Sequence, residues 1–270
     1  MKRLSFLLIL IILMLPLSAC NKETKDSKQN GNKNSKPATT DTTIVKETEI
    51  NTEESTTEPT TPDIHSEYYI EGVSVDDVIT YFNEVCLDAE FVYSGDPSLL
   101  QKWDSEIKYI IHGNYTDEDL QTLNNFVNWL NTIEGFPGIK ETTMTYEANM
   151  NIYFCDEQKM MEIMGNDMTD LDGRVTFWYD NDIIYDATIC YRTDIEQYTR
   201  NSVILEEIYN GLGPLQDTAL REDSIIFSGF STPQQLTEID ELILKLLYHP
   251  DMKCGMNKED CEQVIRNLYY

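Results

Sequence analysis

The chain has 270 residues and a formal net charge of −28 at pH 7, with 48 Asp and Glu residues against 20 Lys and Arg. A charge of this sign repels nucleic acid and anionic cell-wall polymers, so we expect no nucleic-acid partner. The length allows one substantial domain with additional segments, and the sequence contains no internal repeat.

The N-terminal segment is typical of an exported lipoprotein. Two basic residues precede an apolar run over residues 4–17, which leads into the lipobox Leu17-Ser18-Ala19-Cys20. We therefore predict a signal peptide over residues 1–19 and acylation of Cys20. Two acyl chains on this residue would hold the protein stably on the extracytoplasmic face of the cell membrane.

The segment that follows, residues 20–66, is predicted to be a disordered tether. After Cys20 it contains no aromatic residue and is rich in Lys, Asn, Thr, Glu and Ser, so it cannot bury enough apolar surface to fold. Its Lys-rich and Asn-rich composition favours a Gram-positive origin. Residues 67–270 are then expected to form a single domain.

The first part of this domain is predicted to alternate helices and strands. Ser74 with Asp77 and Thr116 with Asp119 are spaced as capping boxes, each followed by an apolar stripe of helical period. A Gly-Phe-Pro-Gly run at residues 135–138 ends the second of these helices. The expected elements are a helix over 74–90, a strand over 107–111, a helix over 116–130, a strand over 149–155 and a helix over 156–164.

The second part is predicted to contain a hairpin, a central helix and two further helices. Strands over 173–179 and 183–192 are joined by Asp180-Asn181-Asp182, which is typical of a tight turn. We expect the strand over 183–192 to be the edge of the sheet, with the helices on one side. The remaining helices are predicted from Thr232, with Pro233 at the first position, to His249, and from Asn257 to Leu268.

The central helix is predicted within residues 199–217, TRNSVILEEIYNGLGPLQD, and has an unusual polar face. An apolar stripe that includes Ile204 and Ile208 lies opposite a polar group. The run Gly211-Leu212-Gly213-Pro214 ends the helix sharply and returns the chain toward its last turn. We therefore predict a polar cluster formed by Glu206, Glu207, Asn210, Gln216 and Asp217, with Gly213 as the structural turn.

The spacing of this cluster is that of a zinc-peptidase helix without its zinc ligands. In the H-E-x-x-H-x-x-G-x-x-H pattern two imidazoles lie on one helix face and the Glu activates water. Here Glu206, Asn210 and Gln216 occupy the three His positions, and Glu207 occupies the position of the catalytic Glu. The chain's three histidines lie elsewhere in the sequence, so no zinc site is expected: His65, His112 and His249.

Three segments resemble a bacterial family catalogued as the domain of unknown function number 2927. They are LEEIYNGLGPLQD, DSIIFSG and LTEIDELILKLLYHPDMKCGM, and the resemblance extends over roughly residues 103–256. In this family the helix more often carries Gln where Asn210 stands, and a shorter S-I-F segment follows it. The ending is also similar to that of matrixin-type metzincins, with Leu236, Asp240, Leu247 and Tyr248 at the corresponding places.

These resemblances imply an α+β fold of zincin-like, or metzincin-like, architecture. A small mixed sheet would place its edge strand over the central helix. Because fold-level similarity does not establish an activity, two functions are considered. The first is a degenerate peptidase-like module that binds a peptide or protein partner in the former active cleft, and the second is a hydrolase with Glu207 as general base and an oxygen-liganded metal.

No cofactor is expected on the first hypothesis. On the second, carboxylate and amide oxygens favour Ca²⁺, Mg²⁺ or Mn²⁺ over zinc. A third reading is structural, in which Glu207 and Asn210 bond to the backbone of the neighbouring strand and loop. A calcium loop at residues 167–173 is disfavoured, because Tyr179 would occupy its twelfth position.

The cysteines and tryptophans are read mainly as core residues. Beyond Cys20 there are five cysteines, of which Cys155 and Cys190 end apolar strands and are expected to be buried thiols. One disulfide is considered among Cys86, Cys254 and Cys261, and its pairing is left open. The three tryptophans are expected to be buried or partly buried: Trp103, Trp129 and Trp178.

Overall fold

A computed structural model of the chain describes residues 66–88, 99–165, 171–213, 216–229 and 232–270. Ile64–Tyr270 forms one compact unit. The predicted signal peptide, Cys20 and the predicted tether up to residue 65 lie outside the described residues, as do Asp167 and Asp170. Within the described residues, no helix combines the length and the hydropathy needed to cross a membrane.

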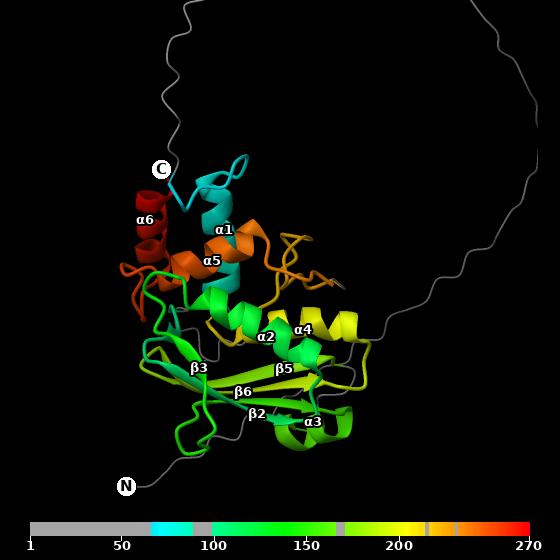
Figure 1. The fold of residues 1–270 in the computed structure, drawn as a ribbon. Helices are drawn as coiled ribbons and strands as arrows, with labels where there is room; N and C mark the ends of the chain where they lie inside the picture. The colour runs from blue at the N-terminus through cyan, green and yellow to red at the C-terminus, as the bar shows by residue number, and fades with distance from the viewer. Residues whose placement is uncertain (1–65, 89–98, 166–170, 214–215, 230–231) are drawn as a thin grey trace, which may run out of the picture. The chain divides into compact units, whose positions relative to one another are not determined.

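A six-stranded, mostly parallel sheet is the framework of this unit (Figure 1). Its strands run in the spatial order β3, β2, β4, β6, with β5 antiparallel on the far side of β6 and the short β1 parallel to the start of β6. The strand bounds are β1 Lys102–Trp103, β2 Ile107–Gly113, β3 Ile139–Glu141, β4 Met150–Cys155, β5 Gly173–Asp180 and β6 Ile183–Arg192.

The register aligns aliphatic side chains across the sheet. Ile111 lies opposite Ile152, Ile152 opposite Ile189, and Ile189 opposite Val175 on the antiparallel strand. Such cross-strand rows of β-branched residues stabilise neighbouring strands and fix their pairing, because a slip of one residue would reverse their faces.

The edge strand beside the central helix is β5, so the prediction that residues 183–192 form the edge is wrong. Residues 187–192 of β6 pair with β4 on one side, and β5 pairs with β6 along its other side. The hairpin between β5 and β6 is confirmed, with Asn181 and Asp182 at φ of 50° and 63°. Strand β6 therefore lies inside the sheet, and the side chains of Ala187, Ile189 and Tyr191 on it are fully buried.

Helices cover both faces of the sheet, whereas the sequence predicted them on one side. Helices α2 (Asp117–Leu130) and α4 (Gln197–Asn210) lie over one face, and α3 (Glu157–Met164) lies on the other (Figure 1). Alternate residues of β4 explain this, because Ile152 and Phe154 join the main core while Tyr153 and Cys155 join the small apolar cluster beneath α3.

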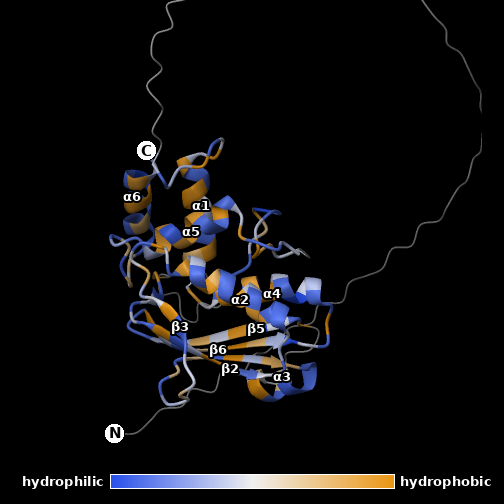
Figure 2. Cartoon of the chain, viewed as in Figure 1, coloured by the Kyte–Doolittle hydropathy of each residue, from blue (hydrophilic) through white to orange (hydrophobic). Residues whose placement is uncertain are grey.

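Three further helices complete the domain beyond α2 and α4: α1 (Val75–Leu87), α5 (Glu238–Tyr248) and α6 (Lys258–Tyr269). Figure 2 shows hydrophilic and hydrophobic residues side by side around these helices, as expected when one face of each packs against the core. The capping boxes predicted at Ser74 and Thr116 are confirmed, and so is the start of the last helix, where Asn257 is the N-cap.

The start of α5 was predicted wrongly. The helix begins after Thr237 and not after Thr232, because Asp240 closes a capping box with Thr237. The Asp240 carboxylate accepts hydrogen bonds from the Thr237 backbone at 3.0 Å and the Thr237 hydroxyl at 2.8 Å. It also accepts a bond of 2.6 Å from the Ser224 hydroxyl, so the same carboxylate ties the preceding loop to the helix.

Candidate functional site

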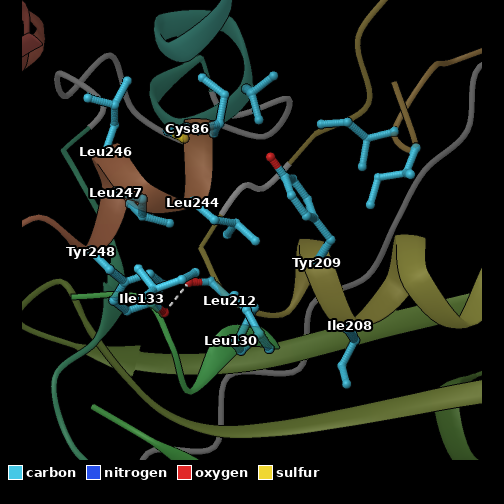
Figure 3. Packing of buried hydrophobic residues seen from close by; sticks show 14 of the residues in the cluster. Cys86, Leu130, Ile133, Ile208, Tyr209, Leu212, Leu244, Leu246, Leu247 and Tyr248 are labelled. Carbon is cyan, nitrogen blue, oxygen red and sulfur yellow. Dashed lines mark hydrogen bonds between the residues drawn. The ribbon is translucent and has the colours of Figure 1, made fainter. Parts of the chain in front are cut away.

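The C-terminal end of helix α4 is held by side chains from other elements. The indole nitrogen of Trp103 donates to the Gly211 carbonyl at 2.9 Å, and the Tyr248 hydroxyl donates to the Leu212 carbonyl at 2.7 Å. Figure 3 shows Leu212 and Tyr248 within the packed core, joined by this bond. Carbonyls that the end of a helix leaves without intrahelical partners are thereby satisfied in a buried environment. The position of the cluster on α4 is therefore fixed by the core.

Gly213 lies in a turn that only glycine tolerates easily. Its φ is +135°, and a Cβ built there would lie 2.7 Å from the Gln101 carbonyl oxygen. Gly213→Ala is expected to lower the free energy of unfolding by about 2 to 4 kcal/mol, through backbone strain and this clash. Urea denaturation measures the change. Gly165→Ala is the matched control, because Gly165 also has positive φ but has no atom within 4 Å of the added Cβ.

Glu207 lies against the edge strand β5 and not in solvent. Its residue is 9 % exposed, and its carboxyl group accepts a hydrogen bond from the Val175 backbone. Gly173 permits the close approach, since a Cβ at that position would lie 3.0 Å from Glu207 Oε1. Burial is the main cause that raises the pKa of Glu207 well above its usual value, and the nearby carboxylates of Glu206 and Asp217 add to it. Burial therefore favours the neutral form of this carboxyl group over the ionised one.

The other predicted residues gather beside Glu207 to different degrees. Glu206 is half-buried, and burial together with the charges of Asp217 and Asp172 raises its pKa to about 8. Asn210 Nδ2 lies 3.5 Å from Asp217 Oδ1, so the chain does return to the last turn of the helix. The Oδ1 atom of Asn210 is buried and has no hydrogen-bond partner within the described part of the chain.

Two residues of this cluster were missed by sequence reasoning. Asp172 precedes β5 and contributes to the raised pKa of Glu206, while Arg174 on β5 opposes the rise in the pKa of Glu207. Asp172 had been considered only as part of a disfavoured calcium loop. Nothing in the local sequence indicated that either residue would act on the carboxyl groups of the central helix, because the effect depends on β5 being the edge strand.

The two histidines that the structure describes lie away from the cluster. His112 interacts with Asn151 at 3.1 Å and stacks on Tyr153, and His249 caps the end of α5. Across the described residues, no group of three or more His, Cys, Asp and Glu side chains is arranged to hold a metal ion. The expectation of a Ca²⁺, Mg²⁺ or Mn²⁺ site therefore stays a prediction.

Two surface hollows lie away from this cluster. The larger, of about 560 Å³, lies between residues 67–71 and helix α5, and the smaller, of about 270 Å³, lies beside α1. Four glutamates line the first, and an acidic lining alone does not identify a ligand: Glu67, Glu71, Glu238 and Glu241. The polar cluster is instead a feature of the margin between α4 and the edge strand.

Fold and cluster together define a mixed α/β protein. Its mostly parallel sheet ends in one antiparallel edge strand, and the helix beside that strand carries the buried Glu207 and the half-buried Glu206. The chain belongs to the family described as protein of unknown function (DUF2927), whose model matches residues 76–267. The match extends further at both ends than the resemblance over residues 103–256. No curated protein matches the chain.

Proposed function

We propose that this protein is a membrane-anchored extracytoplasmic lipoprotein whose zincin-like domain is a degenerate peptidase that binds an extended peptide or protein segment. The observation that carries the proposal is the antiparallel edge strand β5, which lies beside the helix with the peptidase-like spacing of acidic residues. Among the strands in the described residues, β5 pairs with β6 alone. An extended segment can add to such an edge through main-chain hydrogen bonds.

The direction of the backbone groups on β5 supports strand addition. Because Val175 offers its N–H to Glu207 and not to β6, the alternation of an antiparallel ladder turns the N–H of Phe177 away from β6 as well. Trp178 and Tyr179 follow, and their side chains are 45 % and 52 % exposed. The second half of β5 therefore offers both backbone donors and aromatic surface to a partner.

Charge indicates the chemistry of that partner. The chain has a net charge of −28, and the charges of Asp172 and Asp217 lie close enough to Glu206, beside the start of β5, to raise its pKa. A segment with Lys or Arg side chains would be attracted to this margin, and one rich in Asp or Glu would be repelled. The partner class is thus a basic peptide or a basic segment of a protein.

Binding fits the cluster better than hydrolysis does. A general base must be ionised at the working pH, and burial disfavours the ionised form of Glu207. A protonated carboxyl is also a poor ligand for a hard cation. A metal-dependent hydrolase that uses Glu207 as general base and an oxygen-liganded metal remains the competing function, and the following experiment separates the two.

The test is a basic peptide array applied to the purified full chain, with cleavage followed by mass spectrometry and metal content measured in parallel. We expect peptides to bind without cleavage, and we expect Glu207→Gln to bind them equally. Methylating those backbone nitrogens of a bound peptide that face β5 should abolish binding, while methylating the alternate nitrogens should not. Cleavage that Glu207→Gln removes would instead identify a hydrolase.

The anchor is tested separately. Membrane fractionation and labelling with a fatty-acid analogue should find the protein acylated and membrane-bound, and Cys20→Ala should remove both properties. Cys254→Ala is the control, since it removes a thiol from the domain and leaves the lipobox unchanged. Wild-type protein without label, released in soluble form, would contradict the lipoprotein assignment.

A further inference from the structure

A cluster of sulfur atoms lies on the face of the sheet opposite the polar cluster. Cys155 at the end of β4, Cys190 on β6 and Met160 on α3 are buried together, and Met164 packs against them. The Cys190 thiol donates a hydrogen bond to the Cys155 sulfur. The Met164 sulfur lies 3.8 Å from the Thr176 hydroxyl. Two cysteines of the sheet thus pack against two methionines of the short helix α3.

The register of the strands argues against a disulfide between the two cysteines. Cys190 pairs with Tyr153, and Cys155 pairs with Arg192, so the cysteines are diagonal neighbours two residues apart along the strands. With neighbouring strands about 4.8 Å apart and a rise of about 3.3 Å per residue, their Cα atoms lie about 8 Å apart. This exceeds the separation of about 7 Å beyond which a disulfide requires backbone movement. Both cysteines are free thiols in the structure.

Arg174 lies on the same face of the sheet as the thiols, because it pairs directly with Cys190 across β5 and β6. Its Nε atom is buried and makes no hydrogen bond to any described residue. A buried guanidinium atom without an acceptor is costly, so this face of the sheet favours an anion.

We propose that Cys155, Cys190 and Met160 form a binding site for a soft monovalent metal ion, Cu(I). Thiolate and thioether sulfurs select Cu(I) among the common metals, while carboxylates and imidazoles select the harder ions. Zinc does not fit, because its structural sites take four thiolate, imidazole or carboxylate ligands and only two thiols are present here.

Binding involves no change of oxidation state. The ion arrives and stays as Cu(I), each cysteine loses its proton to solvent, and two Cu–S bonds to thiolates form, with the thioether as a third ligand. The complex of one Cu(I) with two thiolates has one net negative charge, which Arg174 can balance. Cys155 is the point of entry, since it is at the strand end and is 9 % exposed, whereas Cys190 and Met160 are fully buried.

Anaerobic titration of the full chain with Cu(I) held by bicinchoninate tests the site, because transfer of copper bleaches the coloured complex. We expect one equivalent to bind, with loss of binding in the Cys155→Ser and Cys190→Ser double variant. Met160→Leu should weaken binding by about 10- to 100-fold, the range seen for changes around a ligand shell. Cys254→Ser is the matched control and should bind as wild type does.

X-ray absorption at the copper edge keeps the test decisive if the double variant fails to fold. An all-sulfur shell around copper in the wild-type protein supports the site. A shell of nitrogen or oxygen atoms, copper binding that survives in a folded double variant, or no copper binding by wild-type protein would each overturn it. The result is read separately from peptide binding, because none of the three proposed copper ligands lies on the edge strand β5.

Discussion

Replacing Asp119 with alanine is expected to lower the free energy of unfolding by about 3 to 5 kcal/mol, the loss typical of breaking a buried ion pair. Arg200 Nε lies 2.8 Å from Asp119 Oδ1, and the two side chains are 6 % and 0 % exposed. The carboxylate also accepts bonds from Gln197 at 2.6 Å and from the Thr116 backbone at 2.8 Å. Its removal leaves the Arg200 charge buried without a counter-ion between α2 and α4. Urea denaturation at pH 7 measures the loss.

Two comparison variants separate this effect from general damage. Glu162→Ala breaks the exposed pair with Lys159, whose side chains are 55 % and 56 % exposed, and should cost less than about 1 kcal/mol. The double variant Asp119→Leu, Arg200→Met replaces both charges by apolar groups and should recover most of the stability. A loss in Asp119→Ala no larger than that in Glu162→Ala would contradict the prediction.

The same pair has a signature at acid pH. Burial alone would raise the pKa of Asp119, but hydrogen bonds from Arg200, Thr116 and Gln197 and the charge of Arg200 outweigh it and lower the pKa. The stability from this carboxylate is therefore present above its unfolded pKa of about 3.9 and is lost as the pH falls through the lower folded value. The apolar double variant should lack this part of the acid dependence.

Helix starts were largely predictable from sequence because capping is a local interaction. Ser74 with Asp77 and Thr116 with Asp119 each satisfy backbone donors within three residues, so the pattern is visible without knowledge of the fold. The missed start of α5 shows the limit of this method. Thr232 with Pro233 had a plausible local signal, but the capping box at Thr237 is reinforced by contacts of the buried Asp240 with Ser224 and Ile225.

The order of the strands could not be predicted in the same way. Both arms of the β5–β6 hairpin have apolar character, and their local patterns do not say which arm pairs with β4. The exposure of Trp178 has the same origin: it lies on the edge strand, so the expectation of a buried or partly buried indole was wrong. The short strands β1 and β3 were missed because two or three residues carry no periodicity.

Only those contacts of the candidate site that follow from helical spacing and the glycine turn could be predicted from the sequence. Glu206, Glu207 and Asn210 lie on one turn, and the glycine turn returns Asp217 to them, so their proximity follows from local geometry. The burial of Glu207 does not, because it depends on the edge strand above it. Two adjacent acidic residues on a helix usually face solvent. Here the packing of α4 against β5 buries Glu207 instead.

Replacing both Glu206 and Glu207 with glutamine is expected to make the protein more stable than wild type at pH 8, by on the order of 5 kcal/mol from Glu206 alone. The pKa of Glu206 is about 8 in the folded protein, and burial raises the pKa of Glu207 well above its usual value. A Glu side chain in the unfolded protein has a pKa of about 4.3. Between these values the folded state holds protons that the unfolded state has lost. Wild-type stability therefore falls as the pH rises above about 4.3.

Glutamine removes this dependence because it is neutral at every pH and can still accept the bond from Val175. Unfolding by urea at pH 4, 6 and 8 should show equal stabilities at pH 4 and a growing advantage of the double variant above it. Glu222→Gln makes the same change at an exposed position and controls for net charge. A double variant that loses stability at pH 8 would contradict the prediction, because it would mean that the ionised carboxylates stabilise the folded protein.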